Sequence, residues 1–414
     1  MKQIIFYGAG GHANAYLELW IEKGIVPVCF VDEDKSKHNA KVRCKHGEFV
    51  ILPLSEAILR YPEYEIFLSV DSNNFPIVMK YLLGKGIPKS RFYSSGGPKH
   101  CPLLGTNFVV HGPGLQTCCT NLDFCLPRSG CTSDDIAKYA EHCLFLFNAL
   151  NEGLYTPCVD CIMIQDGKAN HNLQMKTANL SSGLIGGERC NLKCSYCTYG
   201  EEFGSTRYGD SVYDILQYLS EHTEVEIITY ASGEVTVSDY RDDIFKLWKA
   251  KKWKGSILTN AMIYSEDIAH LLQEKLITIN CSIDAGTSDT FRVLKGVDGF
   301  ASVIENLERY ASISGGRGLI IKYILLDGVN CNYTDIIGFL SIAQKINAEV
   351  MLSRDVLVRE LPMTRNEETA FALFIEQCQK DDIDYTVVES CFLADLAEIR
   401  EITNFEYADI SSTL

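Results

Sequence analysis

Short apolar segments with the character of strands alternate with helical segments along most of this 414-residue chain. In the first part, strands are expected at 4–7, 26–31 and 66–70, with helices at 14–22 and up to residue 83. From about residue 179, six further strands are expected between helices, near 181–185, 225–230, 255–258, 277–283, 318–325 and 348–352. Such alternation predicts an α/β protein with parallel sheets. The first part fits a Rossmann-like parallel sheet, and the second fits an open (βα)6 partial TIM barrel.

The regular pattern fades between residues 96 and 169, where eight cysteines lie from Cys101 to Cys161. We therefore expect a Rossmann-like domain at 1–95, a Cys-rich bridge at 96–175, a partial barrel at 176–390 and a C-terminal tail at 391–414 that begins as a helix. A chain of this length has room for two or three packed domains.

Charge and composition exclude several classes of function. The net charge is −16, from 38 basic and 54 acidic residues, which argues against a surface that follows nucleic-acid phosphates. No run approaches the ~20 apolar residues of a membrane span, and the N-terminus lacks the features of a secretory signal. We therefore expect a cytoplasmic protein. In that compartment, 17 cysteines indicate metal or iron–sulfur ligation rather than disulfides.

The strongest local signal is the octet CNLKCSYC, which places Cys190, Cys194 and Cys197 in a CxxxCxxC pattern. Three thiolates so close in sequence can hold three corners of an iron–sulfur cubane and leave the fourth iron open to a ligand. Zinc is the competing metal, but a structural zinc site takes four protein ligands, usually from two separated pairs.

The octet, with Tyr196 before its last cysteine, resembles the signature of the radical S-adenosylmethionine (SAM) superfamily. The resemblance implies a [4Fe–4S] cluster on the three cysteines, with SAM chelated by the open iron. Reductive cleavage of SAM then gives a 5′-deoxyadenosyl radical that abstracts hydrogen from a substrate. A one-electron donor such as flavodoxin or ferredoxin is also implied. The cofactor supplies this chemistry, and the protein orients and protects it.

Further matches to this superfamily follow in order along the predicted barrel. Ser232-Gly233-Glu234 resembles its Gly-Gly-Glu motif, and Thr259-Asn260 followed by Ala261 resembles Thr-Asn-Gly. Ser282-Ile283-Asp284 resembles Ser-x-Asp, and Arg292 and Lys295-Gly296 follow in the usual place. Ser353-Arg354-Asp355 comes after the sixth predicted strand and is also expected to face the site, because barrel active sites lie at the carboxyl ends of strands. Taken singly, each motif reads as a turn or a helix cap. Taken together, they imply a set of SAM-binding residues: Tyr196, Ser232, Gly233, Glu234, Asn260, Ser282, Asp284 and Arg292.

A second metal site is suggested by the cysteines of the bridge. Two separated groups of thiolates could bind a second iron–sulfur cluster or a zinc ion. Our preferred ligand set is Cys119, Cys125, Cys158 and Cys161, with Cys118 and Cys131 as substitutes in the first group. The resemblance is to the Cys-rich SPASM-type extensions of some radical SAM proteins, although those usually follow the barrel. Unligated thiols are the alternative.

A glycine turn, Gly8-Ala9-Gly10-Gly11, lies between the first strand and the first helix, and Asp32 ends the next strand. This arrangement is typical of dinucleotide-binding turns, in which phosphate meets a helix N-terminus. The segment also resembles the N-terminal domain of nucleotide-sugar acyltransferases, which implies a bound nucleotide or nucleotide sugar. A docking domain that has lost its ligand is the alternative.

Three functions follow from these patterns. The first is a radical SAM enzyme that acts on a nucleotide-linked sugar or a related surface-glycan precursor. The second is a radical SAM maturase of a ribosomal peptide or protein. The third is a metal-stabilised binding protein without catalysis. No catalytic acid or base can be named from the sequence.

Overall fold

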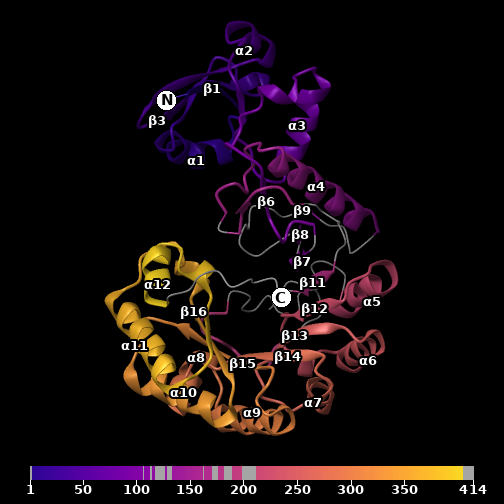
Figure 1. Ribbon diagram of the computed structural model, residues 1–414, viewed down its shortest axis with the longest axis vertical. Coiled ribbons are helices and arrows are strands. Elements are labelled where there is room, and N and C mark those ends of the chain that lie inside the picture. The colour runs from indigo at the N-terminus through magenta and orange to yellow at the C-terminus, as the bar shows by residue number, and fades with distance from the viewer. Residues whose placement is uncertain are drawn as a thin grey trace. The chain divides into compact units, whose positions relative to one another are not determined.

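The structure is a computed structural model that describes residues 2–105, 107–111, 114–116, 126–127, 133–161, 163–169, 176–180, 189–197 and 211–403 (Figure 1). The predicted strand at 181–185 and the candidate ligands Cys119 and Cys125, with Cys118 and Cys131, lie outside the described residues. The chain forms two compact units. The N-terminal unit comprises 1–107, 115–127 and 134–174, and the C-terminal unit comprises 108–114, 128–133 and 175–414.

The N-terminal unit is built on a five-stranded sheet with the order β3-β4-β2-β1-β5. Its strands are β1 (Lys2–Tyr7), β2 (Ile25–Val31), β3 (Lys41–Cys44), β4 (Gly47–Leu52) and β5 (Ile66–Leu68). The three predicted strands, β1, β2 and β5, are parallel, with β1 between β2 and the edge strand β5. The expectation of a purely parallel sheet is wrong at one edge. There β3 and β4 form an antiparallel hairpin in which Cys44 pairs with Gly47, so a two-residue turn connects the strands.

Aromatic packing forms the core of this unit. The helices are α1 (Gly11–Glu22), α2 (Leu54–Arg60) and α3 (Phe75–Gly84). The fully buried ring of Phe6 on β1 stacks on Phe67 of β5 with 4.7 Å between ring centroids. Trp20 of α1 packs edge-on against Phe67 at 4.9 Å. Burial of side chains of this size on one sheet face gives the unit a core of its own.

A later segment of the chain extends the same unit. The backbone of 93–95 pairs with 153–155, because Tyr155 N–H donates to the Tyr93 carbonyl at 3.0 Å and Ser95 N–H to the Gly153 carbonyl at 2.8 Å. Helix α4 (Ser133–Asn151) precedes this pairing and was not predicted. The short strands β6 (Lys99–His100) and β10 (Gln165–Asp166) pair antiparallel. The N-terminal unit is therefore assembled from segments that lie far apart in sequence.

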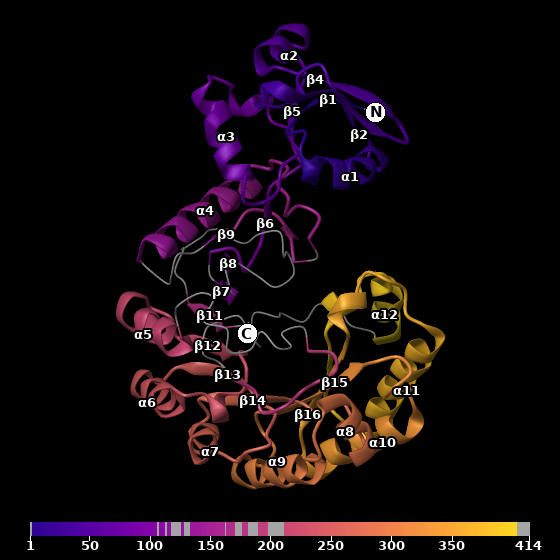
Figure 2. The same ribbon diagram turned by 180° about the vertical axis from the view of Figure 1, so that it is seen from behind.

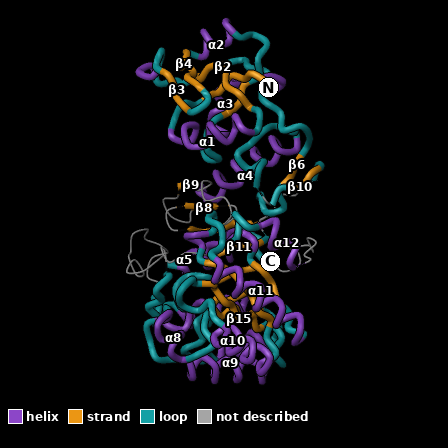
Figure 3. The backbone as a smooth tube through the Cα atoms, turned by 90° about the vertical axis from the view of Figure 1, so that its left-hand side faces the viewer, coloured by secondary structure: helices purple, strands orange, loops and turns teal. Residues whose placement is uncertain are grey.

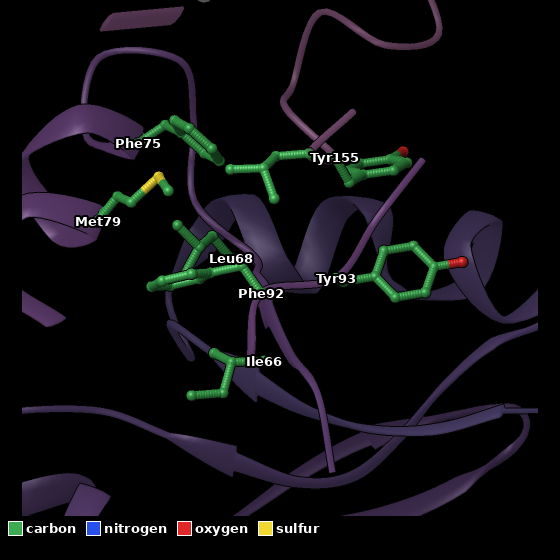
Figure 4. A pocket seen from close by; sticks show the side chains of 8 residues that line it. Ile66, Leu68, Phe75, Met79, Phe92, Tyr93 and Tyr155 are labelled. Atoms are coloured by element: carbon green, nitrogen blue, oxygen red, sulfur yellow. The ribbon is translucent and has the colours of Figure 1, made fainter. Parts of the chain in front are cut away.

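Figure 4 shows a small apolar cavity beside β5 in this unit. Its volume is about 10 Å³, close to the minimum space that one water molecule needs. Side chains of β5 and α3 and of the paired segments enclose it, among them Leu68, Phe75, Met79, Phe92 and Tyr155. A cavity of this size and character belongs to the packed core and offers no ligand site.

The C-terminal unit contains seven consecutive parallel strands in the order β17-β16-β15-β14-β13-β12-β11, and β7 (Asn107–His111) lies next to β11. The seven are β11 (Thr177–Leu180), β12 (Ile227–Tyr230), β13 (Lys254–Leu258), β14 (Ile277–Ser282), β15 (Leu319–Leu325), β16 (Glu349–Arg354) and β17 (Tyr385–Val387). The α/β class with a parallel sheet is confirmed for this unit, and β17 adds a strand beyond those predicted. The chain also contains β8 (Gly114–Gln116) and β9 (Leu126–Pro127).

Helices cover the outer face of this curved sheet (Figure 2), and Figure 3 shows α8, α9, α10 and α11 near β15. The helices are α5 (Val212–His222), α6 (Arg241–Lys251), α7 (Glu266–Gln273), α8 (Ser288–Lys295), α9 (Phe300–Ser314), α10 (Tyr333–Ile346), α11 (Arg365–Asp381) and α12 (Leu396–Thr403). None of the described helices of the chain is both long and apolar enough to cross a membrane. Parallel strands with helices on one face bring their carboxyl ends to a common edge, where polar loops can meet.

Candidate functional site

The loop that carries the three cysteines is fixed to the end of α8 by its backbone. Lys193 N–H donates to the Lys295 carbonyl at 3.0 Å, and Ser195 N–H donates to the Leu294 carbonyl at 2.8 Å. Gly296 ends α8 with a φ of 72°, and a Cβ there would lie 2.8 Å from the Lys193 carbonyl oxygen. Glycine is therefore required at this position both by the backbone conformation and by the close approach of the cysteine loop.

The three thiols are half-buried and near one another. Burial raises the pKa of the Cys194 thiol to about 11, with the Lys295 ammonium opposing and the Cys190 and Cys197 thiols adding to the rise. Burial also raises the pKa of Cys190. The Cys190 Sγ accepts hydrogen bonds from Leu192 N–H at 3.5 Å and from the Asn260 amide at 3.8 Å. Such N–H···S contacts commonly surround the cysteine ligands of iron–sulfur clusters.

The three cysteine thiols could in principle serve a single metal ion or an iron–sulfur cluster. Among the described residues, no three His, Cys, Asp or Glu side chains come together closely enough to hold a single metal ion. A cubane places each thiolate on a different iron, so its cysteines stand farther apart than the ligands of one zinc ion. Three neighbouring thiols, with no fourth ligand among the residues that the structure describes, fit a [4Fe–4S] cluster with one open iron. Cys190, Cys194 and Cys197 are the residues that would hold it.

Beneath the cysteine loop, Tyr196, Asp284 and Lys295 form a cluster that we call the buried triad. The Lys295 ammonium lies 2.5 Å from Asp284 Oδ2, and the two side chains are 2% and 0% exposed. The Tyr196 hydroxyl donates to the same carboxylate and accepts from Lys295. Burial, followed by the Asp284 charge, raises the pKa of Tyr196, which keeps the phenol protonated. The triad connects the cysteine loop to the ends of β14 and α8.

Two further hydrogen bonds, one to its side chain and one to its backbone carbonyl, hold Asp284 in place. Its Oδ1 accepts the Ile324 amide of β15 at 2.8 Å, and its backbone carbonyl accepts the Asn330 amide at 2.9 Å. Asp284 adopts a φ of 58°, in the left-handed region that Asp tolerates better than most residues. The bonds from Ile324, Tyr196 and Lys295 satisfy a carboxylate that has no contact with solvent, as burial of a charge demands.

Glu234 is a second buried carboxylate, held by hydrogen bonds between the ends of β12 and β13. Its carboxylate is 1% exposed and accepts the Thr236 hydroxyl at 2.7 Å, the Thr259 hydroxyl at 2.9 Å and the Asn260 backbone amide at 2.6 Å. Burial raises the pKa of this carboxyl, and the donors that surround it oppose the rise. The Asn260 side chain also donates to Asn191 Oδ1 at 2.7 Å, which connects β13 to the cysteine loop.

Ala261 replaces the glycine that the resemblance leads one to expect after Asn260. The structure gives Ala261 a φ of 54° and 1% exposure, so this position does call for the left-handed conformation that glycine adopts most easily. The Asn306 amide of α9 donates to the Ala261 carbonyl at 2.9 Å. That bond helps to hold the strained turn.

Residues 184–340, which include the three cysteines and the polar strand ends, match the sequence model of the radical SAM superfamily. The chain carries a radical SAM domain. Enzymes of this superfamily use a [4Fe–4S] cluster together with SAM. The expected family, and with it these cofactors, is therefore confirmed.

Three similar proteins illustrate the range of the superfamily. A probable GTP 3′,8-cyclase of Saccharolobus solfataricus is 32% identical over 126 residues, 29% of this chain and 39% of that protein. An S-adenosylmethionine-dependent nucleotide dehydratase of a Thermoplasmatales archaeon is 27% identical over 135 residues, 32% of this chain and 48% of its own. Streptococcus suis SuiB bound to its precursor peptide SuiA superposes with a TM-score of 0.42 at 15% identity, over 67% of this chain and 66% of that one.

The similarity to these relatives is confined to part of each protein. The chain spans less than half the length of the two sequence relatives, so the match concerns the radical SAM domain alone.

The predicted SAM-binding residues of the domain fall into three groups. Tyr196, Glu234, Asn260 and Asp284 bind one another and the neighbouring backbone, as described above. Ser232 is buried and Gly233 has a φ of 52°, both in the turn after β12, while Ser282 is half-buried at the end of β14. The structure does not bring Arg292 to this site. Its side chain is 60% exposed and pairs with Asp289 at 2.9 Å, because Phe291, Leu294 and Lys295 occupy the buried side of α8.

The predicted group at the end of β16, Ser353 to Asp355, also divides. Ser353 is buried, and its neighbour Arg354 turns toward α11, where it pairs with Glu367 at 2.8 Å and donates to three carbonyl groups. Asp355 accepts the Leu357 amide at 3.0 Å as a local cap. The expectation that Arg354 and Asp355 face the site is wrong, because these side chains hold the chain after the strand.

The glycine turn of the N-terminal unit has the expected geometry. Gly8 has a φ of 109°, and a Cβ there would meet Val70 at 2.8 Å, whereas Gly10 and Gly11 have open space within 4 Å. Asp32 Oδ2 accepts the Ala9 amide at 3.1 Å and pairs with Lys37 at 2.8 Å. Partial burial acts to raise the pKa of Asp32. The hydrogen bonds from Lys37 and from the Asp34 and Ala9 backbone amides together outweigh burial and lower the pKa.

Of the tentative auxiliary ligands, Cys158 and Cys161 lie within the described residues. Both are half-buried, and Cys161 N–H donates to the Cys158 carbonyl at 3.0 Å, so one turn brings the pair together. The auxiliary site stays a prediction.

Sequence reasoning missed several residues of the site. Thr236 and Asn330 support Glu234 and Asp284 through contacts described above. Thr and Asn are common in turns, and no local pattern distinguishes these two. Lys295 and Gly296 were noted in sequence only as residues that follow Arg292.

Proposed function

We propose that this chain is a radical SAM enzyme whose catalytic cluster is held by Cys190, Cys194 and Cys197. The match of residues 184–340 to the superfamily, with the cysteine loop docked at the carboxyl edge of the sheet, carries the proposal. When bound, the cluster and SAM together supply reductive cleavage of SAM and hydrogen abstraction from the substrate. A flavodoxin or ferredoxin is the proposed electron donor.

The chain's own residues contribute position and exclusion of water. The buried triad fixes Tyr196 between two of the cluster ligands, and Gly296 allows the loop to approach α8. Glu234 holds the turn after β12 against the end of β13, and Ser232 and Gly233 of this fixed turn are the proposed contacts for SAM. Ser282, half-buried at the end of β14, is the proposed polar contact for SAM from the neighbouring strand. Rigid supports of this kind are what a reactive intermediate requires.

The proposed substrate is a nucleotide-linked molecule, such as a nucleotide sugar or a related glycan precursor. Two relatives of the domain carry names that refer to nucleotide substrates. In the N-terminal unit, helix α1 begins at Gly10–Gly11 without a side-chain cap, which leaves its first amides available for phosphate. Asp32 stands beside that turn, in the position of a ribose-binding carboxylate. We assign nucleotide binding to this turn and the radical chemistry to the barrel.

Anaerobic reconstitution tests the core of the proposal. The full chain is loaded with iron and sulfide, iron is counted, and 5′-deoxyadenosine is measured after addition of dithionite and SAM. We expect about four irons from the catalytic cluster, and about eight if the bridge cysteines hold a second one. Cys194→Ala should abolish 5′-deoxyadenosine formation and the iron of the catalytic cluster.

The matched control is Cys391→Ala, which removes a half-buried cysteine outside the cluster loop and should leave iron and product unchanged. Retention of zinc instead of iron, without SAM cleavage, would favour the metal-stabilised binding protein. SAM cleavage stimulated by a ribosomal peptide, but by no nucleotide sugar, would replace the proposed substrate with a peptide.

A further inference from the structure

The inner face of the barrel sheet, opposite the helices, can be assigned residue by residue. On β15, the ring of Tyr323 packs against Phe339 of α10 at 4.9 Å and Phe374 of α11 at 5.8 Å. Ile321 and Tyr323 are fully buried on this helix side, so Lys322 between them points to the inner face. The parallel register pairs Lys322 with Ser282 of β14 and with Met351 of β16. Residues in register share a face, so these two side chains also point inward.

The inner face is polar where a closed barrel is apolar. Closed barrels of this type fill the interior with layers of Val, Ile and Leu side chains. Here the inward positions of the middle strands include polar Asn280, Ser282, Lys322 and Ser353 beside apolar Ile320, Ile324 and Met351, whereas the adjacent positions Cys281, Ile321, Tyr323 and Leu352 are buried on the helix side. The Asn280 amide reaches Met351 Sδ at 3.7 Å, across β15, which confirms that both side chains lie on this face. A polar inner face is suited to a polar ligand.

Lys322 is half-buried, and no carboxylate of the described residues pairs with its ammonium. Two acids on or next to the flanking strands are engaged elsewhere. Asp284 pairs with Lys295, and Glu349, at the start of β16, accepts the Thr386 hydroxyl at 2.8 Å. Within the part of the chain that the structure describes, this positive charge on the inner face therefore has no counter-charge, and a buried or half-buried charge is costly unless an opposite charge meets it.

Two neutral groups near Lys322 are also without partners. Ser353 is 1% exposed, and its buried hydroxyl has no hydrogen bond within the described structure. The same is true of the Asn280 side-chain oxygen. Ser353 is in register with Ile324, two residues beyond Lys322, and Asn280 stands two residues before Ser282, so both are diagonal neighbours of Lys322. Buried polar atoms are rarely left unsatisfied in native proteins, and a bound ligand is one way to satisfy them.

We propose that Lys322 binds an oxyanion of the substrate, a phosphate or a carboxylate, on the inner face of the radical SAM barrel, with the Ser353 hydroxyl as a second donor. Asn280 accepts a hydrogen bond from a hydroxyl or amine of the same molecule. The inference rests on the proposed function, because it assigns part of the substrate of that enzyme. Lys322 is a specificity-determining residue in this assignment, and its contact with the substrate is ionic and non-covalent.

The test uses the reconstituted full chain saturated with SAM, and titration calorimetry with inorganic pyrophosphate and with succinate as probes. The wild type should bind at least one probe, and the preferred probe identifies the oxyanion as a phosphate or a carboxylate. Lys322→Gln should weaken that binding at least tenfold, and Lys322→Arg should restore most of it. Lys254→Gln is the matched control, because Lys254 is an exposed lysine at the start of β13 and its loss should change the dissociation constant less than twofold.

Three results would overturn the assignment. Unchanged binding of both probes by Lys322→Gln would place the anion elsewhere, for example at the glycine turn of the N-terminal unit. A tenfold loss of SAM affinity in Lys322→Gln would mean that the ammonium serves SAM itself. Absence of binding of either probe to the wild type would also exclude the site. Failure of the proposed function is separate, since it would appear as missing iron and missing 5′-deoxyadenosine in the wild type.

Discussion

Asp32 and Asp284 each follow the carboxyl end of a parallel strand and each pair with a lysine, but they do so in different surroundings. In the N-terminal unit, the side chains of Asp32 and Lys37 are 15% and 36% exposed, and five residues separate them. In the C-terminal unit, Asp284 and Lys295 are 0% and 2% exposed. The hydrogen bonds of Asp284 also reach Tyr196, 88 residues away, and Ile324, 40 residues away.

The difference shows how one residue type can serve two purposes. The Asp32 pair is partly solvated, so water replaces much of what is lost when the pair breaks. The Asp284 pair has little access to water, so removal of one partner leaves a buried charge unsatisfied. A buried pair adds little net stability relative to an apolar one, and its value here is that it fixes the cysteine loop in one position.

The largest effect is expected from Lys295→Met, which leaves the Asp284 carboxylate buried without its cation. Loss of one partner of a buried pair costs about 3–5 kcal/mol in the free energy of unfolding. The described tryptophans divide between the units, since Trp20 lies in the N-terminal unit and Trp248 and Trp253 lie in the other. In a Trp20→Phe background, urea unfolding followed by fluorescence therefore reports the radical SAM domain. We also expect loss of bound iron after reconstitution.

Arg354→Met provides the control for this prediction. It breaks a second buried pair in the same unit, with both side chains 3% exposed, and should reduce stability by a similar amount. Because Arg354 faces α11, this variant should retain its iron at a temperature where it stays folded. If both variants lose iron equally, the triad has no specific role in positioning the loop.

Gly296→Ala should have an intermediate effect. Any side chain at a φ of 72° costs about 1–2 kcal/mol, and here the methyl group would also press on the Lys193 carbonyl. Gly315→Ala at the end of α9 is a close match, since its φ is 68° and nothing lies within 4 Å. The two variants should lose similar stability in urea, but Gly296→Ala should bind less iron. Equal iron contents would show that the loop adapts to the methyl group.

The smallest effect is expected for Lys37→Met. An ion pair with this exposure contributes about 0–1 kcal/mol, and Asp32 keeps its bonds to the Ala9 and Asp34 amides. Hydrogen exchange of the amides in residues 8–22, measured by mass spectrometry, should increase less than tenfold. An increase in exchange that corresponds to about 3–5 kcal/mol, the loss expected for Lys295→Met in the radical SAM domain, would contradict this prediction. It would mean that the glycine turn depends on the Asp32–Lys37 pair far more than the exposure of the pair implies.

The sequence was informative where the signal is local. Apolar runs predicted the central strands of both units, and the CxxxCxxC spacing identified the cysteine loop. The β3–β4 hairpin was missed because Val42 is the one buried side chain of β3. Helix α4 was missed although Tyr139, Cys143, Leu146 and Leu150 lie on one buried side with helical spacing. Its cysteine was attributed to the irregular bridge instead.

The partners of the site residues could not be predicted in the same way. Asp284 and Glu234 were expected to contact SAM, but their partners come from other strands and loops that only the folded sheet brings close. The position of Arg292 was available from the sequence. Phe291 and Leu294 define the buried side of α8, and helical geometry then places Arg292 on the exposed side. Similarity to a motif predicted proximity to the site better than it predicted the direction of a side chain.

The pairing of residues 93–95 with 153–155 has a consequence for biosynthesis. The Ser95 hydroxyl donates to the carbonyl of Gly153, which is 58 residues further along the chain. Ribosomes add about 5–20 residues per second, so these partners emerge several seconds after the first strands of the sheet. During this interval the nascent N-terminal unit exposes the side of β5 that Leu154 and Tyr155 later cover. Chaperones that recognise apolar nascent segments would therefore be expected to engage this protein between these two stages of synthesis.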